Sequence, residues 1–132
     1  MIESPRIIQL PKISDLRGNL TFLQYPQLIP FKIERTYWTY DVPGGEIRGG
    51  HAYKSQEEVI IALSGSFDVH TIDKEGNILK YSLNRSYYGL YIPAGIWRHI
   101  ENHSTNALSL HLSSTKYSEN DYIRNFDDIQ KV

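Results

Sequence analysis

Residues 45–65 read GEIRGGHAYKSQEEVIIALSG, and much of the architecture follows from them. The stretch predicts two short strands, Ile47–Lys54 and Glu58–Leu63, because apolar, aromatic and β-branched residues lie between Gly-containing turns. Side chains repeat every two residues along a strand, so we expect His51 and Tyr53 on one face of the first strand. The Ser-Gly pair that closes the stretch tolerates a positive φ, which predicts a hairpin turn there.

The same alternation of strands and turns continues on both sides of this stretch. Pro, Gly, Asn and Asp interrupt the chain about every 8 to 12 residues, a pattern typical of antiparallel sandwiches and barrels. The other expected strands are Leu20–Tyr25, Ile33–Tyr40, Phe67–Asp73, Ile78–Ser82, Tyr87–Ile92, Trp97–Glu101 and Ala107–Ser113. Further turns are expected at Pro43–Gly45, Lys74–Asn77 and Pro93–Gly95. An all-β fold with a closed barrel or two sheets is therefore predicted.

A helical pattern is visible near the C-terminus. Ser118 stands three residues before Asp121, as in a capping box, and Tyr122, Phe126 and Ile129 recur at i, i+4 and i+7. We expect one short amphipathic helix there, within a single domain that spans residues 1–132.

Charge and composition exclude several classes of function. Fourteen Lys and Arg against fifteen Asp and Glu give a net charge of −1, without the basic field that nucleic-acid binding requires. The longest apolar run has five residues, whereas a membrane helix needs about 20 and a signal-peptide core about 7. We expect a soluble, cytoplasmic protein with no nucleic-acid or membrane partner. The chain has no cysteine, which excludes disulfides, thiolate nucleophiles and Cys-ligated metals.

The spacing of Gly45, His51, Tyr53, Glu58 and Gly65 resembles the first cupin motif, in which two histidines and a glutamate bind a metal. Tyr53 stands where that motif has its second histidine. The phenol leaves this motif one imidazole short.

A later segment resembles the second cupin motif, with Pro93–Gly95 and Asn102 in place but Arg98 at the histidine position. A guanidinium makes no bond to a metal and repels divalent cations. His99 would replace the missing ligand only after a one-residue slip, which in a strand turns it to the opposite face. Two of four expected ligands are missing, so we expect neither a catalytic metal nor a cofactor.

The remaining polar residues of these motifs form a candidate site for an anion. His51 is the candidate base, because an imidazole suits proton transfer near neutral pH. Arginines are the usual means of holding phosphate groups. The residues expected beside the base are Tyr53, Tyr37, Arg48, Arg98 and Arg17. Together they predict proton transfer on a phosphorylated or nucleotide-linked molecule.

The sequence resembles the dTDP-4-keto-6-deoxyglucose 3,4-ketoisomerases across nearly the whole chain. These are metal-free cupins similar to the dTDP-sugar 3,5-epimerases. The segments that carry the resemblance are Asp15–Leu20, Arg35–Trp38, Arg48–Lys54, Gly89–Trp97 and Tyr117–Arg124. The resemblance implies an all-β cupin, a double-stranded β-helix or jelly-roll barrel, that acts as a homodimer on a dTDP-linked keto-deoxysugar. It also implies a place in dideoxy-aminosugar biosynthesis for surface polysaccharide.

Under this resemblance His51 is the base that removes the C3 proton, and Tyr53 or Tyr37 shuttles protons. The arginines and Lys54 hold the substrate. Two departures affect the configuration at C4 of the product: many members read His-Ala-His where this chain has Tyr53, and many have His where this chain has Arg98. The alternatives are a 3,5-epimerase-like enzyme, a metal-dependent cupin, and a non-catalytic sugar-nucleotide-binding cupin.

Structural roles are expected for several other residues. Glu58 is interpreted chiefly as the partner of a buried Arg98, because an unpaired buried guanidinium is costly. His111 is expected in the barrel interior or at a subunit interface. The N-terminal segment Ile7–Leu10 is expected to cover a sheet edge by pairing with a second copy. Surface or hairpin positions are expected for His70 and His103, and packing roles for Trp38, Tyr87, Tyr88 and Tyr91.

Overall fold

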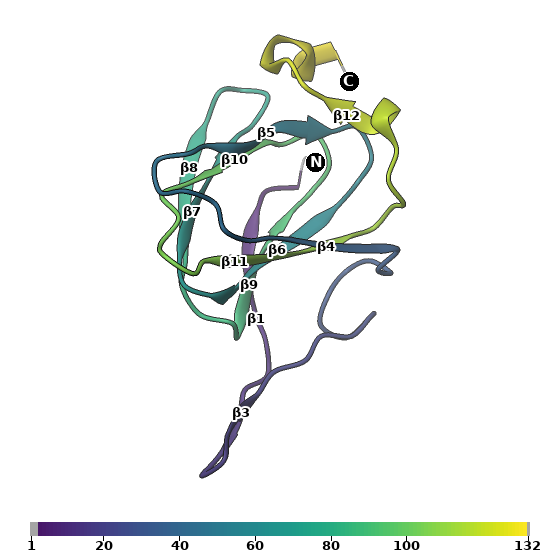
Figure 1. Cartoon of the computed structure of the whole chain (residues 1–132). Helices are drawn as coiled ribbons and strands as arrows, with labels where there is room; N and C mark the ends of the chain where they lie inside the picture. Colours follow the sequence, from purple (N-terminus) through teal and green to yellow (C-terminus); the bar gives the residue numbers. More distant parts are fainter. Residues whose placement is uncertain (1–2, 132) are drawn as a thin grey trace.

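The computed structural model describes residues 3–131 and arranges them as two five-stranded sheets with a separate hairpin (Figure 1). The first sheet, in the order β1-β9-β6-β11-β4, contains Arg6–Gln9 (β1), Tyr88–Ile92 (β9), Glu58–Ser64 (β6), Leu108–Ser113 (β11) and Arg35–Thr39 (β4). The second, in the order β12-β5-β10-β7-β8, contains Tyr122–Ile123 (β12), Arg48–Tyr53 (β5), Trp97–Glu101 (β10), Phe67–Ile72 (β7) and Ile78–Leu83 (β8). The hairpin pairs Ile13–Asp15 (β2) with Gly18–Leu20 (β3).

The two sheets are held together by apolar side chains that alternate along the strands. In β7, Phe67, Val69 and Thr71 are buried, whereas the residues between them are half-buried. Ile60 and Leu90 of the first sheet belong to the same buried cluster as Phe67 and Val69 of the second. This alternation is the signature of a sheet with one face on the core. The all-β prediction is confirmed.

Eight of the nine expected strands are present with ends within two residues of the prediction. The strand expected at Leu20–Tyr25 is wrong. Leu20 ends β3, and the next residues do not join a sheet; the Gln24 carbonyl instead accepts a hydrogen bond from the Leu28 N–H at 3.0 Å. Alternating side chains alone do not form a strand where no neighbouring strand is available to pair with it.

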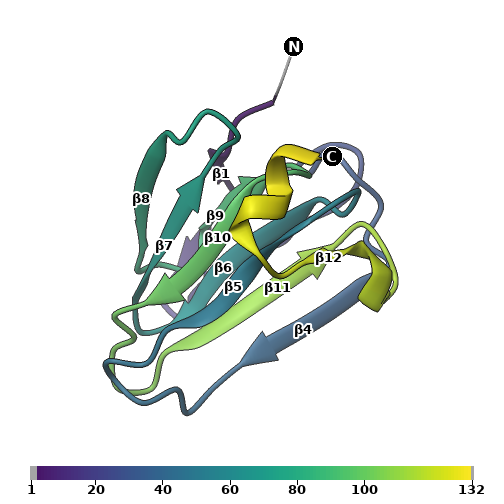
Figure 2. The same ribbon diagram turned by 90° about the horizontal axis from the view of Figure 1, so that it is seen from above.

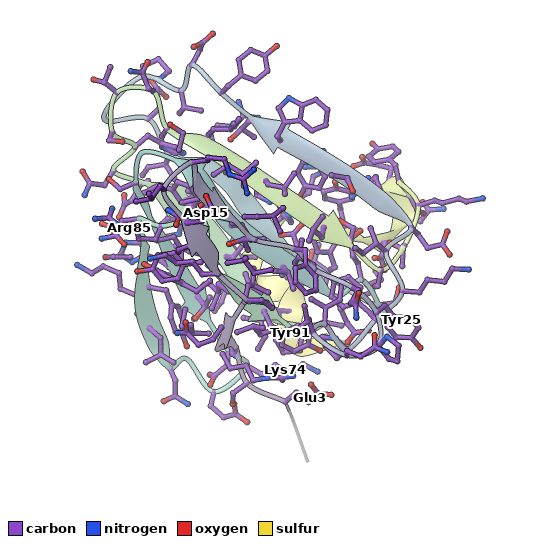
Figure 3. All side chains as sticks on the ribbon, turned by 90° about the horizontal axis from the view of Figure 1, so that it is seen from below. Glu3, Asp15, Tyr25, Lys74, Arg85 and Tyr91 are labelled. Carbon is purple, nitrogen blue, oxygen red and sulfur yellow. The ribbon has the colours of Figure 1, made fainter. Side chains whose placement is uncertain are left out.

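The N-terminal segment covers a sheet edge, as expected, but its partner is β9 of its own chain, where a second copy was expected. The Arg6 guanidinium lies 4.4 Å from the centre of the Tyr91 ring, and the Tyr91 hydroxyl donates to Glu57 at 2.6 Å. Figure 3 shows Tyr91 on the same side of the molecule as Glu3, whose carboxylate lies 3.2 Å from that hydroxyl. These contacts fix β1 as an edge strand of the first sheet.

The single C-terminal helix expected from the sequence is wrong. The segment forms two 3-10 turns, Glu119–Asp121 and Phe126–Lys131, on either side of β12, and it lies over β5 (Figure 2). Pairing with the edge of β5 satisfies backbone groups that a helix would have bonded internally. Ile123 and Ile129 are buried against Ala52. Among the described residues no helix is long and apolar enough to cross a membrane.

Candidate active site

A cavity of about 280 Å³ opens between the two sheets, and polar side chains dominate its lining. The first sheet supplies residues from β4, β6 and β11, and the second from β5, β10 and β12. The lining residues are Tyr37, Thr39, Arg48, Gly49, His51, Glu58, Ile60, Arg98, Ile100, His103, His111, Tyr122 and Arg124.

A β-bulge brings Arg48 and His51 to the same cavity. Residues three apart on a regular strand point to opposite faces. In β5, however, His51 is opposite Arg98 and Arg48 is opposite Ile100, so three steps on one strand match two on the other. Gly49 provides the positive φ of 70° at this bulge. The bulge therefore places a cation beside the candidate base.

Arg98 and Glu58 form a buried ion pair across the cavity floor. The Arg98 Nη1 donates to Glu58 Oε1 at 2.8 Å, and each side chain is only 1% exposed. The Arg98 guanidinium also lies 5.0 Å from the centre of the Tyr53 ring. Its Nη2 is buried and has no hydrogen-bond partner among the described residues. The predicted pairing of these two residues is confirmed.

Glu58 is the centre of a wider hydrogen-bonded group. Its Oε2 accepts from the Tyr37 hydroxyl at 2.5 Å, and its Oε1 lies 3.6 Å from His111 Nδ1. Burial alone would raise the pKa of this carboxyl, but His111, Arg98 and Tyr37 together lower it to about 2. Glu58 is therefore a fixed negative charge in the neutral range.

His51 is held in its neutral form. Its ring lies 5.1 Å from Tyr122 and 4.7 Å from Tyr53, and its Nε2 is buried without a partner among the described residues. Burial, and then the positive charge of Arg98, lower the pKa of His51 to about 3. A neutral imidazole with a free ring nitrogen can accept a proton from a molecule in the cavity.

Three tyrosine hydroxyls form a chain behind and beside this base. The Tyr53 hydroxyl lies 3.4 Å from that of Tyr37 and donates to that of Tyr122 at 3.4 Å. Burial and the Glu58 carboxylate raise the pKa of Tyr37 and of Tyr53 well above their ordinary value. Tyr37 and Tyr53 are therefore protonated in the neutral range and can act as proton donors.

The structure brings together part of the site predicted from the sequence. His51, Tyr37, Arg48 and Arg98 line the cavity, and Tyr53 is fully buried directly behind them. Two of the expected substrate-binding residues, Lys54 and Arg17, lie outside the cavity. Lys54 is exposed outside the cavity lining.

Arg17 is the second of these residues. It lies on the β2–β3 hairpin, which projects away from the two sheets (Figure 1). Its side chain is 91% exposed and donates to Asp15 at 2.8 Å. Within one chain Arg17 therefore does not reach the cavity.

Sequence reasoning did not assign Tyr122, Arg124 or His103 to the site, although all three line the cavity. Tyr122 and Arg124 come from the C-terminal segment, where the Arg124 guanidinium lies 4.4 Å from the centre of the Tyr122 ring. Their inclusion in the Tyr117–Arg124 segment of the family resemblance was the available signal. His111 takes the interior position of the two considered for it, and His103 is buried against Phe67 in the β10–β11 loop.

The donor set at this cavity does not fit a divalent metal. Both carboxylate oxygens of Glu58 already accept hydrogen bonds, one from Arg98 and one from Tyr37. The cationic Arg98 lies directly opposite His51, where a metal would have to bind. The same fixed charges instead suit an organic anion.

Comparison with known proteins identifies the family of this chain. Residues 3–132 match the family described as "WxcM-like, C-terminal" (FdtA). A TDP-4-oxo-6-deoxy-alpha-D-glucose-3,4-oxoisomerase from Aneurinibacillus thermoaerophilus is 37% identical over 127 residues, which cover 96% of this chain and 90% of the relative.

Solved structures give the same result. A TDP-quinovose 3,4-ketoisomerase from Campylobacter jejuni is 39% identical, with a TM-score of 0.93 over 99% of this chain and 100% of that one. A mutant 3,4-ketoisomerase from Thermoanaerobacterium thermosaccharolyticum, in complex with TDP-4-keto-6-deoxyglucose, is 31% identical, with a TM-score of 0.94 over 99% and 94% of the two chains. The chain belongs to the WxcM-like (FdtA) family, in which these relatives are sugar-nucleotide 3,4-ketoisomerases.

Proposed function

We propose that this protein is a 3,4-ketoisomerase that converts dTDP-4-keto-6-deoxyglucose to a dTDP-3-keto-6-deoxyhexose. One observation carries the proposal beyond the family match. His51 Nε2 and Arg98 Nη2 are both buried, both belong to residues that line the cavity, and neither has a partner among the described residues. A neutral base next to an available cationic donor is what abstraction of a proton beside a carbonyl requires.

The reaction needs no net oxidation. The C4 carbonyl acidifies the hydrogen on C3; His51 takes that proton, and the C3–H electrons form the C3–C4 double bond of an enediolate. The C3 hydroxyl then loses its proton and becomes the ketone, while C4 receives a proton and its oxygen becomes a hydroxyl. One carbonyl is lost and one is formed, so the step is an intramolecular oxidation and reduction.

Fixed charges in the cavity support the enediolate. Arg98 and Arg48 offer positive charge in a site where Glu58 is already paired with Arg98. The Tyr37 hydroxyl is hydrogen-bonded to Glu58 and to the Tyr53 hydroxyl, so it is placed to return a proton or to relay one. Tyr53 contributes through that chain, since it is buried behind the lining.

The size of the cavity limits which part of the substrate it can hold. Its volume of about 280 Å³ lies at the lower end of ligand pockets, which run from about 300 to 1,000 Å³. We therefore place the sugar ring in the cavity and the nucleoside diphosphate at its mouth. Among the residues that line the cavity, we assign Arg48 and Arg124 to the pyrophosphate, because guanidinium groups bind phosphate well.

We also propose that the enzyme is a homodimer. The projecting hairpin exposes Ile13, Leu16 and Leu20, with Leu16 fully exposed, and such an apolar surface is typical of a protein interface. In a dimer, Arg17 of one copy could contact the part of a substrate that extends from the cavity of the other copy, and Lys54 could contact the same part. Light scattering should give about twice the chain mass of 15.3 kDa, and Leu16→Asp should reduce it to one chain. A wild-type mass of one chain at micromolar concentration would contradict the dimer.

We further propose that the protein acts in the cytoplasm, where nucleotide-linked sugars are available. Its product would be used to make a dideoxy-aminosugar of surface polysaccharide.

The direct test is His51→Asn, which removes the base and keeps the side-chain size similar. We expect kcat/KM to fall by about 10²–10⁴-fold, with dTDP binding unchanged by calorimetry. Full activity in this variant would overturn the assignment of the base.

A further inference from the structure

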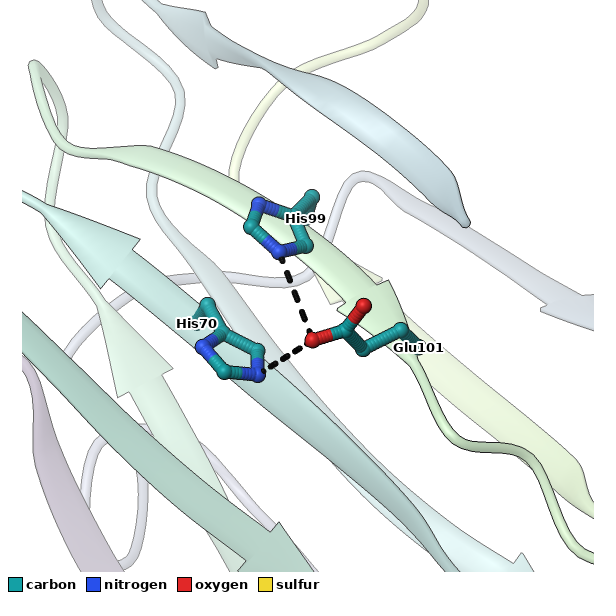
Figure 4. A group of neighbouring side chains, drawn as sticks. All are labelled: His70, His99 and Glu101. Carbon is teal, nitrogen blue, oxygen red and sulfur yellow. Dashed lines mark ion pairs between the residues drawn. The ribbon is translucent and has the colours of Figure 1, made fainter. Parts of the chain in front are cut away.

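Two histidines and a glutamate lie together on the outer face of the second sheet (Figure 4). His70 comes from β7, and His99 and Glu101 come from β10. Neighbouring residues of β10 point the other way, since Arg98 and Ile100 line the cavity. The cluster is therefore separate from the site described above, with the thickness of the sheet between them.

The strand register holds the three side chains together. His70 and His99 are directly opposite each other in the β7–β10 pair, and their rings stack with centroids 4.8 Å apart. Glu101 follows His99 by two residues on the same face, and its Oε1 lies 2.8 Å from His70 Nε2 and 3.9 Å from His99 Nε2. One ligand atom from each residue lies within 4.8 Å of the other two.

These distances suit a tetrahedral metal. Zinc bonds to imidazole nitrogen and carboxylate oxygen at about 2.0–2.2 Å, so neighbouring donor atoms in a tetrahedral site are about 3.3 Å apart. The two measured donor separations, 2.8 and 3.9 Å, lie on either side of that value. The imidazoles are 22% and 26% exposed, so a metal has a path in and the stacked rings have room to turn toward it.

We propose that His70, His99 and Glu101 form a zinc-binding site, with water in the fourth position. Imidazole and carboxylate donors are the combination that zinc accepts in three-ligand sites. The charges around the cluster favour a cation. Asp68 lies opposite Glu101 and precedes His70 by two residues, so it lies on the same face as the cluster. Lys80 lies opposite His70 on β8 and adds one positive charge to that face, whereas Asp68 and Glu101 add two negative charges.

Zinc at this position would join two neighbouring strands of the second sheet. A ligand that binds the folded chain and not the unfolded chain raises the unfolding temperature. Because the cluster faces away from the cavity, isomerase activity in the absence of zinc should be the same in His70→Ala as in the wild type. The site is thus inferred as structural and independent of the proposed reaction.

The test uses metal-stripped full-length protein titrated with zinc chloride in a calorimeter. We expect one equivalent to bind, and His70→Ala, His99→Ala and Glu101→Gln each to weaken binding by at least about tenfold, since even loss of a group that only orients a ligand costs about 10–100-fold. Zinc should raise the unfolding temperature of the wild type and leave that of His99→Ala unchanged.

Two control variants distinguish this cluster from other sites. Lys80→Ala leaves the three ligands in place and should bind zinc at least as tightly as the wild type. His51→Asn removes the cavity imidazole and should bind zinc as the wild type does. The proposal is overturned if 100 µM zinc does not bind the wild type, if both histidine variants bind normally, or if His51→Asn is the variant that loses binding. Because the readout is zinc binding, failure here leaves the isomerase proposal standing.

Discussion

At the scale of single residues, Arg98 is the residue that separates this site from a metal centre. Its charge is balanced by Glu58 in a pair that is almost completely buried. One side of the guanidinium is thereby committed to structure, while Nη2 is available to a ligand. Burial, and then the same charge, lower the pKa of His51, so Arg98 also helps to keep the proposed base neutral.

The low pKa of His51 predicts the pH dependence of the reaction. The base acts only when deprotonated, so activity is lost as pH falls through the pKa of His51, which is about 3 in the free enzyme. An unperturbed histidine would lose half of its base form at about pH 6.5. We expect kcat/KM to stay level from pH 8 down to about pH 5. An acidic limb with its midpoint near 6.5 would contradict the environment described for His51.

Replacement of Arg98 by histidine tests its double role. The variant Arg98→His removes a fixed charge from substrate and enediolate and leaves Glu58 with weaker pairing, so we expect kcat to fall by about 10²-fold. It should also lower stability by up to about 3 kcal/mol, because it breaks a buried pair. The new imidazole should not create a tight zinc site at the cavity, since Tyr53 occupies the other ligand position. Unchanged rate, affinity and C4 configuration in the product would place Arg98 outside the site.

At the scale of elements, the bulge in β5 determines which side chains reach the cavity. Gly49→Val puts a β-branched residue at a φ of 70°, a conformation that costs about 1–3 kcal/mol. We expect the bulge to shift, Arg48 to turn away from His51, and kcat/KM to fall at least tenfold. Gly50→Ala is the matched control, because its added Cβ would meet only Trp97 at an ordinary 3.6 Å. Equal kinetics in the two variants would contradict this role of the bulge.

The C-terminal segment is attached through Asp121. Its carboxylate accepts from the Ser55 N–H at 2.9 Å, the Ser55 hydroxyl at 2.8 Å and the Gln56 N–H at 3.1 Å. Asp121→Ala should release Tyr122 and Arg124 from the cavity wall, raising KM about tenfold and lowering stability by about 2 kcal/mol. Asp127→Ala, which removes an exposed carboxylate on the same segment, should leave both unchanged. Wild-type kinetics in Asp121→Ala would show that the wall forms without this anchor.

The sequence predicted the strands well because alternation and turn residues are local signals. Turn glycines are an example: Gly65 has a φ of 66°, and an added Cβ would lie 2.8 Å from Ala107 Cα. The predictions of a strand at Leu20–Tyr25 and of a C-terminal helix were wrong, because they depend on whether a neighbouring strand is free to pair, and the local sequence does not show this. The periodic Tyr122, Phe126 and Ile129 suit a helix, yet Tyr122 and Ile123 pair with the edge of β5 instead.

The same reasoning explains which site residues were found. His51, Arg48 and Arg98 belong to compact motifs, and their positions followed from strand alternation and family resemblance. The bulge that joins Arg48 to His51 and the return of Tyr122 to the cavity depend on long-range pairing. Arg17 is the converse case, because its motif suggests a ligand contact whereas its hairpin projects from the two sheets.

At the scale of the whole molecule, two groups of polar side chains lie on opposite faces of the second sheet. The inner face presents His51, Arg98 and Glu58 to the cavity between the sheets, whereas the outer face presents the His70–His99–Glu101 cluster. Tyr122 and Arg124 of the C-terminal segment line the cavity, and the β2–β3 hairpin extends beyond both sheets (Figure 1). Catalysis is therefore assigned to one face of the second sheet and metal binding to the other.

The most direct measurement follows the sugar ring by NMR while the protein is incubated with dTDP-4-keto-6-deoxyglucose in deuterated water. We expect the ketone to move from C4 to C3 and C5 to keep its proton, and we expect His51→Asn to slow this change by about 10²–10⁴-fold. A ketone that stays at C4 while deuterium enters C5 would identify a 3,5-epimerase. Substrate that binds and remains unchanged would identify a binding protein, and either result would contradict the isomerase.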